Sequence, residues 1–232
     1  MPAERPDPSR GVFETLRLAG GRVQAMDAHL DRLESSTREL YGRPLPAGLR
    51  ERLHALEGRA APGGGEERVR IDVEPGDRDL EVSVIATPMG PGARAPRELI
   101  PVTVPSGLGA HKWRDRSLLD SLGADPVPLL VDEHGDVLEA AWANVWLLHG
   151  GRLATPPADG RILPGVTRAM LLERAPSLGL VAHERPIALS ELRLGTVVLT
   201  SSLRLAVAAG LGSAPDVEAP AVAEIRRALA EL

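Results

Sequence analysis

Tight turns between short strand-like runs constrain the fold of this 232-residue chain more than any other feature. Ala19-Gly20-Gly21 separates the runs 12–18 and 22–26, which predicts an opening hairpin. Pro75-Gly76-Asp77 joins a second pair of runs, and Gly150-Gly151 lies within a third. Because helical patterns fall between these hairpins without regular alternation, the sequence predicts an α+β fold.

Helical periodicity is clearest in the segment "DAHLDRLESSTRELYG". Leu30, Leu33 and Leu40 fall on one face of the predicted helix, which Asp27 caps and Gly42 ends. Further helices are expected over 49–56, from about 114, over 166–175 and from 217. Strands are expected in "RVRIDVE", "DLEVSVIAT", "ELIPVTVP", "PLLVDE", "ANVWLLHGGRLAT", "TVVLTSS" and "LRLAVAAG".

The segment "PSGLGA", residues 105–110, combines glycine and proline and is the predicted interdomain linker. We expect a small N-terminal domain over residues 1–104 and a larger, β-rich domain over 111–232. No apolar run is long enough to span a membrane, and the start "MPAERPDPSRG" lacks a signal-peptide core, so a cytoplasmic location is expected.

Composition excludes several classes of function. With no cysteine, the chain has no thiolate metal site and no cysteine nucleophile. A net charge of −5 and 2% aromatic residues argue against nucleic-acid binding, which favours a basic surface and stacking rings. No two of the six histidines stand at ligand spacing with a partnering acid, so no metal site is expected.

Lys112 is the single lysine among 27 Lys and Arg residues. Guanidinium stays protonated, so arginine cannot replace an amine that must lose its proton and attack a carbonyl. The chain also has one Asn, one Gln, one Tyr and one Phe, so composition alone leaves chance survival of the lysine as an alternative. Lys112 is therefore the first candidate for carbonyl chemistry.

Pyridoxal 5′-phosphate is a cofactor that needs such an amine, an acid beside its ring nitrogen and a phosphate site. Glu139 follows a turn at a strand end, where it is either the ring partner or a solvated acid. Val166 and Thr167 open a helix, where free N–H groups favour phosphate. Ser202 and Arg32 offer further donors, although Ser202 taken alone is a polar strand end and a surface arginine is the default explanation of Arg32.

In their order along the chain, six stretches resemble the class IV aminotransferase family, the fold-type IV pyridoxal phosphate enzymes. They are "GVFETLR", "HLDRLESS", "HKWRDR", "LEAAWANVWLL", "GRILPGVTR" and "LTSS". The resemblance implies that Lys112 forms the Schiff base and that Glu139 holds the pyridine nitrogen. It assigns phosphate binding to a further set, namely Arg32, Val166, Thr167 and Ser202. It also implies two domains with the cofactor between them, and a homodimer.

The resemblance is compatible with two different reactions on a small-molecule amine substrate. Branched-chain transaminases place a tyrosine shortly after the lysine, whereas this chain has Asp115 and Arg116 there. "Lys-x-x-Asp-Arg" resembles the 4-amino-4-deoxychorismate lyases, and the start at "FETLR", without the family's usual preceding strands, resembles the lyase portion of fused p-aminobenzoate synthases. We expect the lyase, acting through an external aldimine. An amino-acid aminotransferase of branched-chain or D-amino-acid type, with a keto-acid acceptor, is the alternative.

Two rival classes stay open at this point. A non-catalytic vitamin B6 carrier or interaction protein would not need both Lys112 and Glu139. A hydrolase could use Ser201, His111 or His149, but none of them has motif context. The substrate carboxylate could meet one of three arginines that sequence cannot place in the site, namely Arg17, Arg94 and Arg97.

Overall fold

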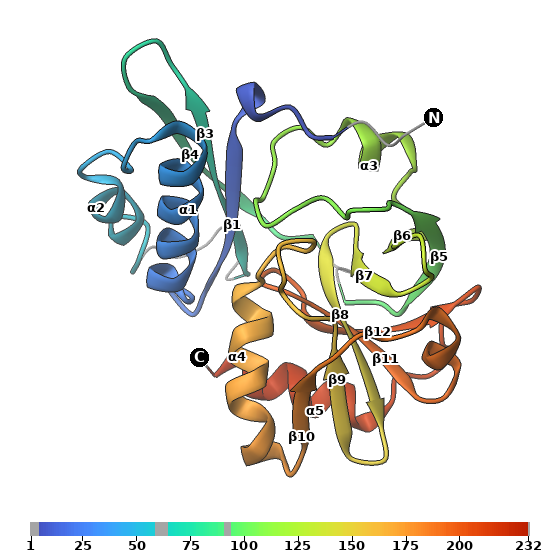
Figure 1. Cartoon of the computed structure of the whole chain (residues 1–232). Coiled ribbons are helices and arrows are strands. Elements are labelled where there is room, and N and C mark those ends of the chain that lie inside the picture. The colour runs from blue at the N-terminus through green and yellow to red at the C-terminus, as the bar shows by residue number, and fades with distance from the viewer. Residues whose placement is uncertain (1–4, 59–64, 91–93, 232) are drawn as a thin grey trace. The chain divides into compact units, whose positions relative to one another are not determined.

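The structure, a computed structural model, describes residues 5–58, 65–90 and 94–231. The chain divides into two compact units, which we name by their main segments (Figure 1). The N-terminal unit comprises Pro6–Ala93 and His111–Arg116. The C-terminal unit comprises Met1–Arg5, Arg94–Ala110 and Ser117–Leu232.

The N-terminal unit contains a four-stranded antiparallel sheet in the order β2-β1-β3-β4. Its strands are β1 (Val12–Ala19), β2 (Arg22–Val23), β3 (Glu67–Pro75) and β4 (Leu80–Pro88). Its helices are α1 (Met26–Tyr41) and α2 (Leu49–His54), preceded by a 3-10 turn at Pro8–Arg10. The opening hairpin and the hairpin at Pro75-Gly76-Asp77 are confirmed.

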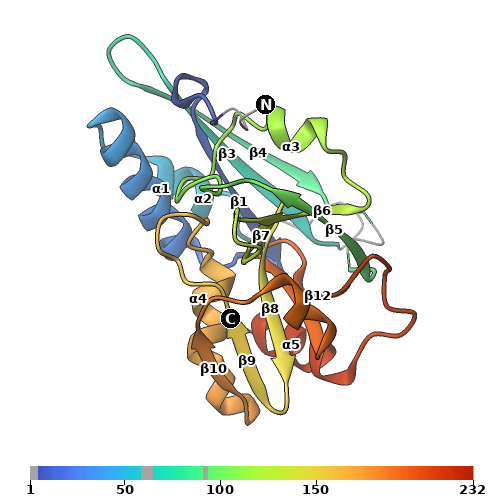
Figure 2. The ribbon, with the colours of Figure 1, turned by 45° about the vertical axis from the view of Figure 1, so that its right-hand side comes forward.

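Helix α1 covers one face of this sheet because strand and helix periodicities point apolar side chains at one another (Figure 2). Leu16 and Ile71 from the sheet pack in one cluster with Leu30 and Leu33. Gly42 ends α1 in the left-handed region, at a φ of 65°, as predicted. Asp27 lies in the first turn instead of capping it, because the helix begins one residue earlier.

The C-terminal unit contains an eight-stranded sheet in the order β10-β9-β8-β11-β12-β5-β6-β7. Its strands are β5 (Arg97–Thr103), β6 (Val127–Val131), β7 (Val137–Ala140), β8 (Ala143–His149), β9 (Arg152–Thr155), β10 (Val181–Glu184), β11 (Thr196–Ser201) and β12 (Leu205–Leu211). Strand β7 also pairs with β8, which closes β5–β8, β11 and β12 into a ring. Strand β10 had no counterpart among the expected strands.

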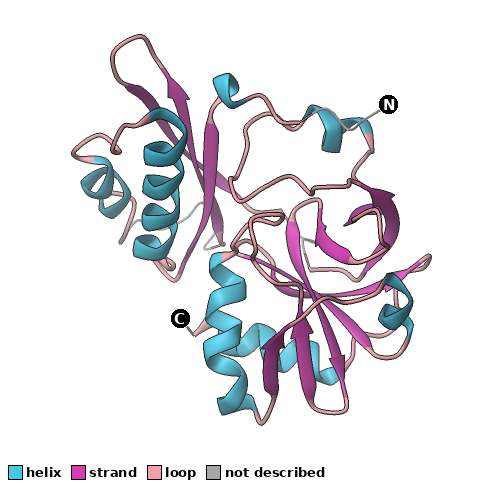
Figure 3. Ribbon diagram, in the orientation of Figure 1, coloured by secondary structure: helices cyan, strands magenta, loops and turns pink. Residues whose placement is uncertain are grey.

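Helices α3 (Ser117–Ser121), α4 (Val166–Arg174) and α5 (Pro220–Ala230) complete the C-terminal unit (Figure 3). Leu171 of α4 and Ile225 of α5 pack with Trp146 and Val198, so both helices cover the same part of the sheet. The covering helix expected in the C-terminal tail is therefore confirmed. Among the residues described, none of the helices is long and apolar enough to cross a membrane.

The predicted domain boundary at 105–110 differs from this division. Strand β5, expected in the small domain, pairs in parallel with both β12 and β6 and so belongs to the C-terminal unit. Residues 111–116, expected in the large domain, belong to the N-terminal unit. The helix expected from about 114 begins at Ser117, directly after this segment. A local pattern shows that a strand is present but not which distant strand will pair with it.

Candidate active site

Lys112 lies on a short extended segment held against β1. Phe13 N–H donates to Lys112 O at 2.8 Å, and Arg114 N–H donates to Gly11 O at 3.0 Å. The Lys112 ammonium nitrogen lies 4.7 Å from the centroid of the Phe13 ring. His111 Nδ1 and the buried hydroxyl of Ser36 are 3.0 Å apart, which ties the same segment to α1. The lysine therefore stands on a backbone fixed from two sides.

The charged residues after Lys112 hold this segment in place. Asp115 accepts a hydrogen bond from Asp7 N–H at 2.9 Å and another from Arg10 Nη1 at 3.0 Å. Arg114 pairs with Asp72 at 3.1 Å and also with Glu74. The two acids compensate the Arg114 charge, and Asp115 links the lysine segment to the 3-10 turn before β1.

Arg32 forms a bidentate ion pair with Glu14. Arg32 Nε donates to Glu14 Oε1 at 2.7 Å and Nη2 donates to Oε2 at 2.9 Å. His29 Nδ1 lies 2.8 Å from the same Oε2, and both His29 and Glu14 are 1% exposed. The Nε–Nη2 edge of Arg32 therefore binds Glu14, and a phosphate would have to approach from elsewhere on the guanidinium.

The protonation states of this buried cluster follow from its charges. Burial raises the pKa of Glu14, but the Arg32 charge and the hydrogen bonds outweigh it and hold that pKa well below its usual range. Burial lowers the pKa of His29, Glu14 opposes this, and the positive charges of Arg32 and Lys112 add to the lowering. We therefore assign an ionised Glu14 that accepts Nδ1–H from a neutral His29.

Glu139 lies at the end of β7, opposite Asn144 in β8, and is 8% exposed. Its carboxylate oxygens lie 3.3 and 3.4 Å from the backbone N–H of Leu163. Asn144 Nδ2 donates to Leu163 O at 2.9 Å. Adjacent strands thus hold both polar groups of the Leu163 residue and fix the loop that leads into α4.

Helix α4 begins directly after Gly165, and no side chain caps its first N–H groups. A Cβ at position 165 would stand 1.8 Å from Asn144 Oδ1, so this approach requires glycine. Thr167 Oγ1 and Ser202 Oγ lie 3.3 Å apart beside this helix start. Two hydroxyls and uncapped helix N–H groups form a donor set suited to a phosphate, so these residues fit the expected cofactor.

The six predicted residues fall into two sets, one in each unit. The C-terminal unit holds Glu139, Val166, Thr167 and Ser202. The N-terminal unit holds Lys112 and Arg32, whose charges both act on His29. Sequence reasoning missed Glu14 and Asn144. The signal for Asn144 was available, because it is the chain's single asparagine, just as Lys112 is its single lysine.

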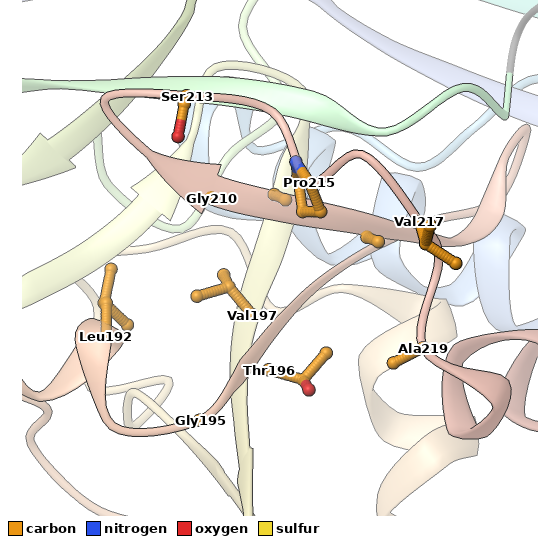
Figure 4. Close-up of a pocket in the computed structure, with 11 residues that line it drawn as sticks. Leu192, Gly195, Thr196, Val197, Gly210, Ser213, Pro215, Val217 and Ala219 are labelled. Carbon is orange, nitrogen blue, oxygen red and sulfur yellow. The ribbon is translucent and has the colours of Figure 1, made fainter.

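Two other features carry no part of this site. A small pocket of about 230 Å³ lies between β11, β12 and the segment before α5, and none of the six predicted residues lines it (Figure 4). Within the described ranges, no group of three or more His, Asp or Glu residues could hold a metal ion. His111, a candidate hydrolase base, has its Nδ1 within hydrogen-bond distance of the Ser36 hydroxyl.

A family model for class IV aminotransferases matches residues 11–209. The chain belongs to this family. Its members are pyridoxal phosphate enzymes, and the α+β fold is fold type IV. A branched-chain-amino-acid aminotransferase of Mycolicibacterium smegmatis is 31% identical over 78% of the chain. The match covers 60% of that enzyme, so the chain spans less than two thirds of its length.

Solved structures share the fold. A fold IV transaminase of Curtobacterium pusillum superimposes with a TM-score of 0.84 at 24% identity, covering 96% of this chain and 85% of that one. A Legionella pneumophila protein with a suggested 4-amino-4-deoxychorismate lyase activity gives 0.78 at 20% identity, covering 96% and 91%. At these identities the similarity shows a shared fold only. One of the two proteins is named as a transaminase and the other as a lyase.

Proposed function

We propose that pyridoxal phosphate binds to the six predicted residues and that the chain acts on a small-molecule amine. The observation that carries the proposal is the C-terminal unit's combination of a nearly buried carboxylate, Glu139, with two hydroxyls at an uncapped helix start. Lys112, on its fixed backbone, supplies the amine. The proposal requires both units to contribute to one cofactor, as the family resemblance implies.

The cofactor, when bound, supplies an electron sink for negative charge on the amine-bearing carbon of the substrate. Lys112 Nζ takes the proton from that carbon, because an amine, unlike the guanidinium of Arg32, can lose and regain a proton. The Glu139 carboxylate holds a proton on the ring nitrogen. Thr167, Ser202 and the N–H groups at the start of α4 bind the phosphate, with Arg32 adding positive charge.

Borohydride reduction tests this assignment, because it converts the linkage between cofactor and lysine into a stable bond. We expect peptide mapping of the reduced protein to find the pyridoxyl group on Lys112. The measurement is independent of turnover. A label on another residue, or no label at saturating cofactor, would contradict the proposal.

For the reaction we propose elimination of pyruvate from 4-amino-4-deoxychorismate, giving p-aminobenzoate. Support comes from the missing tyrosine after Lys112. The chain's single tyrosine, Tyr41, donates its hydroxyl to Pro8 O at 2.8 Å, at the far end of α1 from Met26. Asp115 supports the lyase reaction less strongly. Its carboxylate accepts a hydrogen bond from Asp7 N–H at the 3-10 turn, so its presence also has a structural explanation.

A second candidate is amino-acid transamination, which the name of the M. smegmatis relative favours. The two reactions differ in the fate of the amino group. A lyase releases pyruvate from 4-amino-4-deoxychorismate with no keto-acid acceptor. A transaminase stops after one half-reaction until 2-oxoglutarate or another acceptor is added. Measuring pyruvate from 4-amino-4-deoxychorismate alone therefore separates them, and acceptor-dependent turnover of leucine or a D-amino acid would make transamination correct.

We also propose that the protein is a cytoplasmic homodimer, as the family resemblance implies. Sedimentation at micromolar concentration should give twice the 24.6 kDa chain mass. A fully active monomer would contradict dimerisation.

A further inference from the structure

Arg204 stands in the turn between β11 and β12, two residues after Ser202. Its guanidinium carbon lies 3.9 Å from the centroid of the Trp142 ring. Trp142 occupies the turn between β7 and β8, so it lies in sequence between Glu139 and Asn144. The arginine is thus positioned on an aromatic surface next to the residues that form the C-terminal unit's part of the candidate site.

This arginine is half-buried, yet within the described part of the chain it makes no hydrogen bond or ion pair. Burial lowers the pKa of Arg204, and the charge of Arg97 lowers it further, so two positive charges act on each other here. Arginine nevertheless stays protonated at neutral pH. A partly desolvated cation without a carboxylate partner is costly, and an incoming anion would relieve that cost.

Among the other arginines, Arg17 offers the clearest contrast. Its Nε donates to Glu66 at 2.9 Å and its Nη1 donates to Gln24 at 2.8 Å, so its polar groups are already engaged. Arg17 was a sequence-based candidate for the substrate carboxylate, and its ion pair argues against that role. Arg204 was not a candidate, since nothing in the sequence places it over Trp142.

We propose that Arg204, supported by Trp142, binds a carboxylate group of the amine substrate. A guanidinium that rests its face on an aromatic ring still presents N–H donors at its edge, which match the two oxygens of a carboxylate. A phosphate is the other anion of the site, but Thr167, Ser202 and the start of α4 already supply its donors. The inference rests on the proposed function, because it assigns a substrate contact within the same site.

The test compares two probes that share a ring, 4-aminobenzoate and aniline, and a third that resembles leucine without its amine, 4-methylpentanoate. Binding to the cofactor-loaded protein is measured by calorimetry for wild type, Arg204→Gln and Arg204→Lys. Arg193→Gln, which removes an exposed arginine of the same unit, is the matched control. Thermal unfolding of each variant confirms that it folds.

The two carboxylate probes are 4-aminobenzoate and 4-methylpentanoate. For whichever of them wild type binds more tightly, we expect Arg204→Gln to weaken binding by about 10- to 150-fold, which corresponds to the loss of one charge-assisted contact. The carboxylate affinity of Arg204→Lys should lie between those of wild type and Arg204→Gln, because lysine keeps the positive charge but lacks the paired N–H donors of a guanidinium. Aniline binding, cofactor affinity and all binding to Arg193→Gln should not change. Arg204→Lys also keeps the inference testable if Arg204→Gln does not fold.

Three results would overturn the inference: unchanged carboxylate affinity in Arg204→Gln, no carboxylate binding to wild type, or a loss of cofactor affinity, which would place Arg204 on the phosphate. These outcomes are distinct from failure of the proposed function. If borohydride places no pyridoxyl group on Lys112, the cofactor assignment itself fails. If the label is on Lys112 and carboxylate affinity is unchanged, the role of Arg204 alone is wrong.

Discussion

The two units differ in the ion pairing of the arginines near the candidate site. In the N-terminal unit, the arginines around Lys112 have acid partners: Arg32 pairs with Glu14, and both Arg70 and Arg114 pair with Asp72. In the C-terminal unit, α4 starts without a side-chain cap, and Arg204 stacks on Trp142 without an ion pair in the described residues. Near the candidate site, these three arginines of the N-terminal unit are paired with acids, whereas Arg204 of the C-terminal unit has no acid partner among the described residues.

This difference indicates that the two units have different roles in the candidate site. Internal ion pairs fix positions, so the N-terminal unit is built to hold Lys112 and the α1 face in one geometry. A helix start without a side-chain cap and an arginine without an acid partner among the described residues both favour an incoming anion, so this part of the C-terminal unit is suited to binding one. The comparison predicts different consequences for substitutions in each unit.

The largest effect is expected for Lys112→Arg. Turnover and the borohydride-stable label should both disappear, because arginine cannot supply a neutral amine. Noncovalent cofactor binding should persist, since the C-terminal donors are unchanged. Equilibrium dialysis against pyridoxal phosphate measures this, with Arg193→Gln as control. If the variant loses all cofactor binding, the assignment of phosphate binding to the C-terminal unit is wrong.

Next comes Glu14→Gln, which leaves Arg32 beside a neutral amide. Removing one partner of a buried ion pair typically costs about 3–5 kcal/mol in unfolding free energy. The matched control is Asp159→Asn in the C-terminal unit, whose ion pair with Arg161 is partly exposed on both sides and should cost far less. Urea unfolding compares the two. Equal losses would show that the N-terminal ion pair does not have the stabilising role assigned to it.

A smaller loss is expected for Gly165→Ala, because the added Cβ would meet Asn144 Oδ1. Overpacking of this kind costs about 1–3 kcal/mol and should displace the start of α4, lowering cofactor affinity. Gly90→Ala is the control, since a Cβ there meets nothing within 4 Å. In a double-mutant cycle, Asn144→Ala should reduce the cost of Gly165→Ala. Additive losses would show that the two positions do not interact.

The smallest effect concerns pH. Burial lowers the pKa of His29 in the folded protein. At pH values below the ordinary histidine pKa of about 6.5, the unfolded chain therefore binds a proton at His29 that the folded chain does not bind. Stability should therefore fall as pH decreases from about 6.5, by at most about 1.4 kcal/mol per pH unit for one proton. His29→Gln should remove this part of the slope. A wild-type slope that His29→Gln leaves unchanged would assign it to other groups.

Local signals predicted most elements correctly. The hairpins at Gly20-Gly21 and Gly150-Gly151 and the end of α1 at Gly42 depend on backbone conformations that neighbouring residues specify. The predicted linker at 105–110 does not coincide with the division into units, because β5 and the Lys112 segment pair with strands far away in the sequence. Within the site, residue types pointed to Lys112 and Glu139, but nothing local revealed Glu14 beneath Arg32 or Arg204 over Trp142.

The sequence by itself determined the family, the fold class and the candidate chemical groups, because ordered motifs and a single lysine among many arginines are properties of residue type and order. Tertiary structure decided how those groups are used. Pairing of β1 with residues 111–114 fixes the lysine backbone, and the close approach of Asn144 to Gly165 fixes the helix start. Whether an arginine is paired with an acid, as Arg32 is with Glu14, or has no such partner among the described residues, as with Arg204, depends on which side chains folding brings within a few ångströms.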